Sequence, residues 1–339
     1  MRSMAGAVGI LAAVAAVVSL ADAPVTGQTR VAPGATAAPR DWTPPRTAWG
    51  DPDLQGFFTN NDESGIPLER PGGFEGRRLD EVTSAELAEL TEERNQRAVE
   101  SAATLGQLPG SNPVHWFENF DARNSRAWLL VDPPDGRIPA STPEALGRPV
   151  RRGGSSFGGG PFDGPEDLSL YDRCITRGMP GSMMPGIYGN AYQIVQSPGH
   201  VAIRYEMVHE TRVIPIGSGA HVGSGIRQFM GDGRARFEGN TLVIETTNFD
   251  PKSVYQNGNA DRLRLIERFT ATGPGTVEWS VTVNDPSTWA GPWTFAMNLT
   301  RVEPSGQPFE YACHEGNYAM RNLLSAARVA ERTGGDAGR

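Results

Sequence analysis

Two histidine–glutamate neighbours are the residues of this sequence best suited to acid–base chemistry. The chain has only five histidines, and two of them directly precede a glutamate, in His209-Glu210 and His314-Glu315. A further carboxylate, Glu206, stands shortly before His209. Imidazole titrates near neutral pH, and a neighbouring carboxylate fixes its tautomer and raises its basicity. We therefore predict His314, Glu315, His209 and Glu206 as catalytic residues.

This prediction carries a geometric condition. Side chains alternate between the two faces of a regular strand, so Glu206 and His209 would point to opposite faces. They can act together only if a bulge or a turn lies between them. The alternative for each histidine is an ordinary surface or core residue, with its ring hydrogen-bonded to a backbone carbonyl. We favour that alternative for His115, His200 and His221, and it stays open for the two histidines named above.

Some of these side chains could instead bind a metal ion. Such a site would combine His209, His221 and His314 with Glu210 or Glu315 as a fourth ligand. Their spacing matches no short zinc signature, and we expect the cysteines to be oxidised rather than available to bind metal. The sequence also lacks the G-x-S-x-G pattern of a serine nucleophile. We therefore expect no cofactor, with a bound divalent metal as the alternative.

Charged and aromatic residues in strand-like segments are the candidates for substrate binding. Glu267 falls in register with apolar residues of its segment, which would turn it inward. A buried carboxylate is costly unless it is paired, so it would need an arginine such as Arg204 or Arg212. The alternative places these charges on the solvent face. The predicted substrate-binding residues are Arg204, Arg212, Tyr318, Trp293 and Glu267.

A further set of aromatic residues and methionines stands near the predicted strand ends. Such residues line an apolar ligand cavity in some proteins and simply belong to the core in others. Both interpretations stay open at this stage. The residues are Met183, Met184, Tyr188, Trp289, Trp293, Tyr311 and Tyr318.

The two cysteines and the N-terminal segment predict the compartment. Residues 1–27 have the pattern of a signal peptide, with Arg2, an apolar run of about 16 residues and small residues after it. That run is shorter than the roughly 20 residues that span a bilayer, so we expect no membrane span after signal removal. In an oxidising compartment a single pair of cysteines forms a disulfide, here Cys174–Cys313. We predict a periplasmic or secreted protein.

Composition limits the classes of partner and fold. The net charge of −8 disfavours nucleic acid and anionic lipid, which need a basic face. Hydrophobic residues make up 38% of the chain, enough for a core, and 41 glycines with 27 prolines indicate many loops. We expect the partner to be a small-molecule ligand or substrate. Nothing in the sequence indicates the oligomeric state.

Periodicity divides the chain into a loop-rich part and a β part. We expect a flexible linker over residues 28–46 and a loop-rich wrapping region over 47–190. A capping box of Thr83 and Glu86 predicts one helix over 84–103. Residues 191–317 alternate in hydrophobicity between turn signals, which predicts an antiparallel β domain, and 318–339 form a C-terminal helix and tail. The expected strands are 127–131, 191–197, 200–208, 211–216, 233–238, 241–248, 262–271, 276–284, 292–302 and a short one at 308–313.

Consecutive antiparallel strands joined by short turns are typical of an up-and-down barrel or a curled sheet. No helix-length segment separates them, so a parallel α/β sheet is excluded. The fold class predicted is therefore mainly β, with a lipocalin-like up-and-down antiparallel barrel or curled sheet, an N-terminal wrapping region and few helices.

Several short motifs occur along the chain after the signal. They are Trp49-Gly50-Asp51-Pro52-Asp53-Leu54-Gln55-Gly56, Pro67-Leu68-Glu69-Arg70-Pro71, Asp132-Pro133-Pro134-Asp135-Gly136-Arg137-Ile138-Pro139, Met230-Gly231-Asp232, Phe237-Glu238-Gly239-Asn240-Thr241-Leu242-Val243 and Cys313-His314-Glu315-Gly316-Asn317-Tyr318. Together these motifs resemble those of a group of secreted proteins of unassigned function from acidobacteria and sphingomonad-type proteobacteria. The resemblance spans nearly all of the chain after the signal, and it implies an extracytoplasmic, lipocalin-like β domain. It transfers no catalytic residue.

Two functions from different classes follow from these observations. The first is a periplasmic enzyme that uses His–Glu acid–base chemistry, as a lyase, isomerase or hydrolase, on a small, partly apolar or glycosidic metabolite. The second is a lipocalin-like carrier that holds a hydrophobic small molecule without catalysis. A third interpretation makes residues 104–190 the contact face of a cell-surface interaction module. An arrangement that brings His209, His314 and Glu315 together beside a cavity would favour the enzyme.

Overall fold

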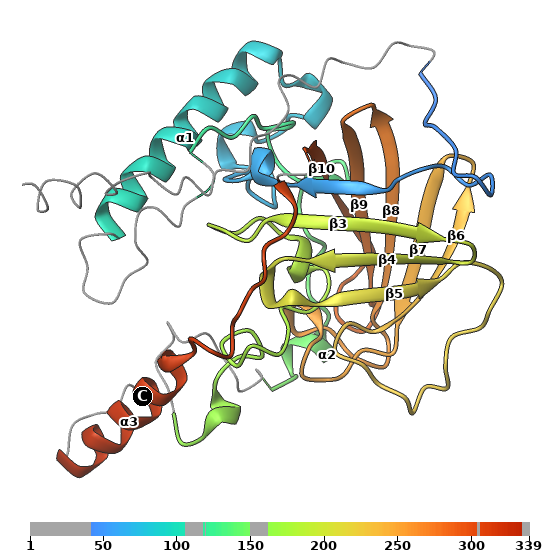
Figure 1. The fold of residues 1–339 in the computed structure, drawn as a ribbon. Helices are drawn as coiled ribbons and strands as arrows, with labels where there is room; N and C mark the ends of the chain where they lie inside the picture. The colour runs from blue at the N-terminus through green and yellow to red at the C-terminus, as the bar shows by residue number, and fades with distance from the viewer. Residues whose placement is uncertain (1–41, 106–117, 119, 150–161, 304–305, 334–339) are drawn as a thin grey trace, which may run out of the picture.

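One large antiparallel sheet forms the body of the protein (Figure 1). The computed structural model describes residues 42–105, 118, 120–149, 162–303 and 306–333. The signal peptide, most of the linker and His115 lie outside these residues. The strands follow the order β5-β4-β3-β1-β10-β9-β8-β7-β6, and β2 pairs with β10 off this path. They are β1 (Gly56–Thr59), β2 (Leu130–Asp132), β3 (Ala191–Ser197), β4 (His200–Tyr205), β5 (Thr211–Pro215), β6 (Asp232–Glu238), β7 (Thr241–Thr247), β8 (Arg264–Gly273), β9 (Thr276–Asn284) and β10 (Trp293–Val302).

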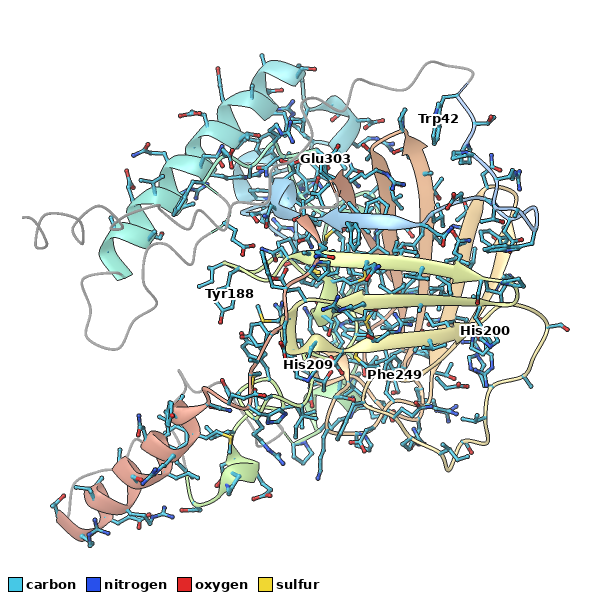
Figure 2. All side chains as sticks on the ribbon, in the orientation of Figure 1. Trp42, Tyr188, His200, His209, Phe249 and Glu303 are labelled. Carbon is cyan, nitrogen blue, oxygen red and sulfur yellow. A yellow bond between two sulfur atoms is a disulfide. The ribbon has the colours of Figure 1, made fainter. Side chains whose placement is uncertain are left out.

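The strands of this sheet alternate between buried apolar and more exposed polar residues, as the sequence predicts. In β9 every second residue is buried, which places Val277, Trp279, Val281 and Val283 in the core. Large rings from neighbouring strands pack around Trp279, including Phe295 with its ring centroid 5.6 Å away. Figure 2 shows side chains filling the space between the curled strands. The mainly β, largely up-and-down antiparallel fold is therefore confirmed.

The predicted barrel does not form, because the two edge strands never pair along their length. A single parallel bridge, Ile216–Ala235, joins the segment after β5 to β6. The sheet nevertheless bends back on itself, since Arg212 of β5 forms an ion pair with Glu267 of β8 at 2.8 Å. Those two strands stand six places apart in the sheet order. The fold is thus an open sheet that curls around a shared core.

A strand that the sequence does not predict lies near the centre of the sheet. β1 pairs with β3 on one side and with β10 on the other. It starts at Gly56, whose φ of +148° is open only to glycine. A Cβ at that position would lie 2.1 Å from a guanidinium nitrogen of Arg301. Residues of the loop-rich region and of the β region therefore share one sheet.

Among the described residues three α-helices accompany the sheet: α1 (Ser84–Leu105), α2 (Pro143–Leu146) and α3 (Tyr318–Thr333). The predicted helix over 84–103 is confirmed with its cap, in which the Thr83 amide donates to Glu86 at 2.8 Å. The guanidinium of Arg94 fixes α1 by donating to the carbonyl of Ala127 at 2.6 Å. α3 extends away from the sheet at the C-terminal end (Figure 1). None of the helices in the described ranges is long and apolar enough to cross a membrane.

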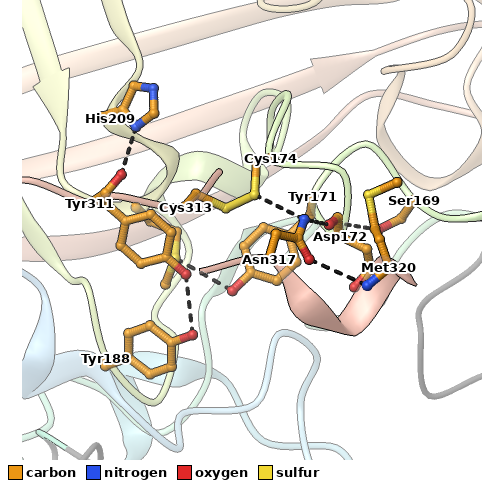
Figure 3. The surroundings of a disulfide bond; sticks show 11 residues. Ser169, Tyr171, Asp172, Cys174, Tyr188, His209, Tyr311, Cys313, Asn317 and Met320 are labelled. Carbon is orange, nitrogen blue, oxygen red and sulfur yellow. Dashed lines mark hydrogen bonds between the residues drawn. A yellow bond between two sulfur atoms is a disulfide. The ribbon is translucent and has the colours of Figure 1, made fainter. Parts of the chain in front are cut away.

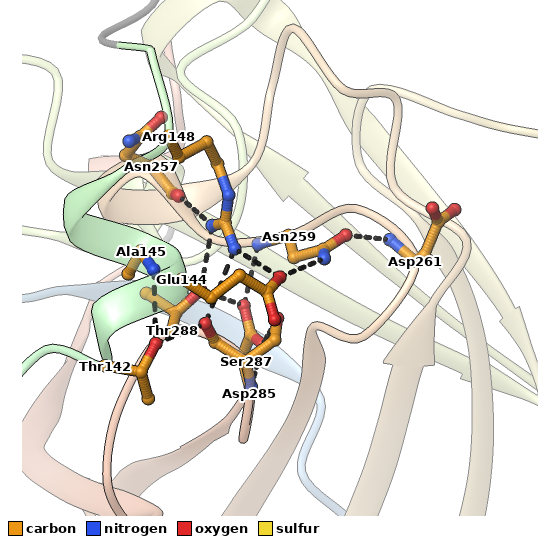
Figure 4. A network of polar contacts seen from close by, with 10 residues as sticks. All are labelled: Thr142, Glu144, Ala145, Arg148, Asn257, Asn259, Asp261, Asp285, Ser287 and Thr288. Atoms are coloured by element: carbon orange, nitrogen blue, oxygen red, sulfur yellow. Dashed lines mark hydrogen bonds and ion pairs between the residues drawn. The ribbon is translucent and has the colours of Figure 1, made fainter.

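A polar network joins α2 to two turns of the sheet (Figure 4). Arg148 donates to the carbonyl of Asn257 at 2.8 Å and to the hydroxyl of Thr288 at 3.0 Å. Asp285, almost fully buried, accepts from Thr288 at 2.5 Å and from the Asn259 amide at 2.7 Å. Because buried polar groups are stable only when hydrogen-bonded, this network fixes the turn over residues 255–259.

Candidate functional site

A groove of about 950 Å³ at one end of the sheet is the candidate site. Three segments line it together with Met207: residues 168–188, residues 252–254 and residues 310–323. Its size is within the range of about 300–1,000 Å³ that small-molecule sites occupy. The polar network around Asp285 fixes the turn that follows residues 252–254, so one wall rests on a rigid support.

A disulfide holds the C-terminal wall in place (Figure 3). Cys174 and Cys313 are bonded, as the sequence predicts, and their Cα atoms lie 5.7 Å apart. Beside the bond, the side-chain amide of Asn317 donates to the backbone carbonyl of Asp172 at 2.7 Å. The covalent bond and this hydrogen bond together fix residues 311–317 against the turn around Cys174.

Three tyrosine side chains line the groove. The hydroxyls of Tyr188 and Tyr311 lie 3.2 Å apart, and their rings are stacked with centroids 6.2 Å apart. Tyr171 donates to the Met207 sulfur at 3.5 Å. Burial, together with the neighbouring Tyr188, raises the pKa of Tyr171 to about 12. Burial also raises the pKa of Tyr311. Both therefore stay protonated at neutral pH and act as hydrogen-bond donors and acceptors rather than as bases.

His209 and His314, the predicted catalytic histidines, come together next to this groove. Their ring centroids are 6.3 Å apart, and both side chains are exposed. Nδ1 of His209 lies 2.8 Å from the carbonyl oxygen of Tyr311. A carbonyl only accepts, so Nδ1 carries the proton, and in the neutral ring Nε2 is left as the acceptor. The ring can thus take up a proton at Nε2.

A turn separates Glu206 from His209, which meets the condition stated for them. β4 ends at Tyr205, and the next residues form a short 3-10 turn in which Val208 has φ +62° and His209 has φ +47°. A positive φ at a β-branched residue is strained, so the surrounding contacts must hold this turn. The amide of His209 donates to the carbonyl of Glu206 at 3.0 Å within it.

The acidity of Glu206, one of the predicted catalytic residues, is perturbed by its surroundings. Burial, followed by the charge of Glu118, raises its pKa to about 7. Its carboxylate accepts from the Ala191 amide at 3.3 Å. Burial raises the pKa of Glu118 as well. Glu118 was not predicted, because a single glutamate in a loop-rich stretch carries no sequence signal of its own.

The segment after β10 is held by side chains and not by a strand ladder. Residues 308–313 are irregular, so the short strand predicted there does not form. The carbonyl of Phe309 accepts from Arg204 at 3.5 Å, and that of Tyr311 accepts from His209. These contacts replace the backbone pairing that a strand would supply.

The other predicted site residues fall into two groups. Glu315 and Tyr318 are both exposed. Glu315 lies shortly before α3, and Tyr318 is the first residue of that helix. Trp293, Arg212 and Glu267 lie in the core, and Glu267 has 0% of its surface exposed. Whether any of them contacts a ligand stays a prediction.

Arg212 is the arginine that meets the inward-facing Glu267. It donates to both carboxylate oxygens, at 3.1 and 2.8 Å, and Thr246 and Trp279 complete the surroundings. Burial works against the charged guanidinium, but the attraction of Glu267 outweighs it and raises the pKa of Arg212. The pair is therefore a charged unit of the core.

Tyr171, Arg177 and Met207 line the groove but were missed by the sequence analysis. The sequence did contain a signal for Tyr171 and Arg177. Both are close to Cys174, and the predicted disulfide brings the neighbours of Cys174 next to Tyr311. Tyr188 and Tyr311 belonged to the aromatic set described above, and the structure places both in the groove.

His221 is elsewhere, on the outer side of β6 and β7, where it contacts Asp232 at 2.9 Å and Glu245 at 3.5 Å. In the parts of the chain that the structure describes, no three His, Cys, Asp or Glu side chains are arranged to hold a metal ion. Comparison with known proteins adds no family, since no family model, curated protein or solved structure matches this chain.

Proposed function

We propose that this chain is an extracytoplasmic protein that binds a small, partly apolar molecule in the groove lined by Tyr171, Tyr188 and Tyr311. The observation that carries the proposal is the groove itself, about 950 Å³ in volume and walled by a disulfide-bonded segment. Stacked rings offer apolar surface, and neutral hydroxyls offer directional hydrogen bonds. A pocket that combines both suits a ligand with a ring and a few polar groups.

The groove is a better place for the ligand than the interior of the curled sheet. A carrier of lipocalin type would hold its ligand between the strands. Here that space contains Trp279, Trp293, Phe295 and the Arg212–Glu267 pair, all almost fully buried. A ligand there would have to displace packed rings and a buried ion pair, whereas the groove needs no such rearrangement.

Mutation of a groove hydroxyl tests binding. We expect native mass spectrometry of protein purified from the periplasm to show a co-purified small molecule. Tyr311→Phe should weaken its binding by roughly two- to tenfold, because one hydrogen bond contributes about 0.5–1.5 kcal/mol. Tyr255→Phe, which removes a hydroxyl outside the groove lining, is the matched control and should bind as the wild type does. Equal affinities for both variants would contradict the proposal.

Acid–base catalysis on the bound molecule is a second candidate function. The specific observation in its favour is that Glu206, with its pKa raised to about 7, lies one turn from His209, whose Nε2 is left as an acceptor. A pKa near the working pH suits a general acid or base. The two residues contact the same C-terminal segment that walls the groove.

Loss of turnover without loss of folding tests this candidate. His314→Gln and His209→Gln should each lower turnover of the co-purified molecule by about 10²–10⁴-fold while the melting temperature stays within a few degrees. Members of one catalytic unit give non-additive losses, so the double variant should be little worse than either single one. Folded variants with full turnover would reject the catalytic role and leave the binding proposal intact.

A further inference from the structure

The basic residues of the groove indicate what kind of molecule it takes. Lysine and arginine together number 31, yet the sequence contains a single lysine, Lys252. This one lysine lines the groove, on the wall formed by residues 252–254. Its own amide donates to Asp250 at 2.8 Å, which fixes the backbone from which the ammonium group extends.

Arg177 is the second cation of the groove. Its guanidinium lies over the ring of Tyr171, 5.7 Å from the centroid, and the residue is half-buried. Within the described residues its only hydrogen bond is a long one, 3.5 Å, to the carbonyl of Met184, and no carboxylate pairs with it. A guanidinium has five N–H donors, so most of its capacity is unused here.

Two other half-buried arginines of this protein have carboxylate partners. Arg126 pairs with Glu278 at 3.1 Å, and Arg148 pairs with Glu144 at 3.2 Å. A partly desolvated cation is stable when an anion or several acceptors face it. Arg177 therefore differs from these residues in lacking the partner that its surroundings call for.

The carboxylates of the groove do not supply that partner. Asp172 accepts from the Ser169 hydroxyl at 2.7 Å inside its own turn. Glu310 lines the groove but is exposed to solvent. Arg177 thus has no carboxylate partner in the groove, because Asp172 is hydrogen-bonded within its own turn and Glu310 is open to water.

We propose that the ligand of this groove is an aromatic carboxylate, or a molecule that joins a ring to a comparable anionic group. Arg177 would bind the anion through two parallel N–H donors, and Lys252 would add a second positive charge. The stacked rings of Tyr188 and Tyr311 would hold the aromatic part. This inference rests on the proposed binding function and adds the class of the ligand to it.

Two probes with the same ring, one anionic and one neutral, test the ligand class. 2-Naphthoate and 2-naphthamide share the same ring system, and titration calorimetry measures the dissociation constant of each. We expect the wild type to bind the carboxylate at least tenfold more tightly than the amide, with a preference that shrinks as sodium chloride is added. Arg177→Gln should remove the preference while amide binding persists, and Arg177→Lys should retain part of it. Arg173→Gln, a change in the same segment but outside the groove lining, should bind both probes as the wild type does.

The single lysine allows the bound position to be checked independently. Acetylation with an N-hydroxysuccinimide ester, followed by peptide mass spectrometry, reports the reactivity of Lys252 without interference from other lysines. Saturating 2-naphthoate should slow acetylation of Lys252 several-fold, and 2-naphthamide should slow it less. Arg177→Gln should reduce the protection given by the carboxylate.

The outcomes separate the two levels of the proposal. Equal affinity for the two probes, with Arg177→Gln affecting both alike, overturns the anionic class and leaves groove binding in place. Binding of 2-naphthoate without protection of Lys252 places the anion elsewhere and overturns the assignment to this groove. If neither probe binds and Tyr311→Phe retains the same co-purified molecule, the ligand class and the proposed function both fail.

Discussion

At the residue scale, three glutamates show how the surroundings decide the role of one side chain. Glu267 is fully buried and ionically paired, Glu206 is partly buried with its pKa raised to about 7, and Glu315 is exposed. The sequence groups them only as carboxylates near strand-like segments. Their differences come from long-range neighbours, such as Arg212 for Glu267 and Glu118 for Glu206.

Breaking the buried Arg212–Glu267 pair should be strongly destabilising. Glu267→Gln leaves the Arg212 guanidinium without its counter-charge in the core. Removal of one partner of a buried pair typically costs about 3–5 kcal/mol, so we expect a loss of that size in the free energy of unfolding. Urea denaturation followed by tryptophan fluorescence measures it.

Two comparisons make this result specific. The double change Arg212→Met with Glu267→Leu removes both charges and should recover much of the lost stability. Arg236→Gln, which breaks an exposed pair with Glu238, should leave the urea midpoint nearly unchanged. A small effect of Glu267→Gln would show that the pair is not the charged core unit described above.

At the element scale, the sequence predicts the strands of the β region to within a few residues because their side chains alternate. β3 and β9 are found over the predicted residues, and α1 begins where its capping box predicts. β1 was missed because a segment of four residues among turn formers has no detectable period, and its place comes from pairing with β3 and β10. Hydrophobic periodicity does not show which distant segments pair in a sheet.

The candidate site was predictable to the same limited extent. His209 and His314 were proposed as catalytic residues from their residue type, and the disulfide was predicted from the cysteine count. The groove depends on irregular segments around Tyr171 and Tyr311, whose backbone is shaped by tertiary contacts and not by a local pattern.

The disulfide should contribute most of its effect through the unfolded chain. It joins cysteines that are 139 positions apart in the sequence, for which the chain-entropy model gives about 5 kcal/mol. We expect the double change Cys174→Ser with Cys313→Ser to lower the free energy of unfolding by up to that amount, as measured by denaturation. Thiol titration of the unfolded, unreduced protein should detect no free thiol, and two titratable thiols would contradict the assignment.

At the scale of the whole molecule, the curled sheet buries carboxyl groups together with its aromatic core. Burial raises the pKa of Glu206 and of Glu63 to about 7, each from an ordinary value of 4.5. Burial also raises the pKa of Glu118 and Glu210. These shifts share one sign, so their effects on the stability of the fold add.

The whole protein should therefore be more stable at mildly acidic pH than above neutrality. A carboxyl group with a raised folded-state pKa keeps its proton in the folded chain after the unfolded chain has lost it. The folded state then binds more protons between pH 4.5 and 7, so stability falls as pH rises through that window. Each of Glu206 and Glu63 can contribute up to about 3 kcal/mol. Glu206→Gln and Glu63→Gln should each flatten the dependence of the urea midpoint between pH 5 and pH 8.

A matched control separates this effect from a general response to pH. The pKa of Glu238 is lowered by Arg268, so its contribution to stability is lost only below its ordinary pKa and outside the window. Glu238→Gln should thus keep the wild-type slope between pH 5 and pH 8. A wild-type midpoint that stays level or rises over this range would contradict the prediction. It would mean that water or a nearby positive charge stabilises the ionised carboxylates in the folded state.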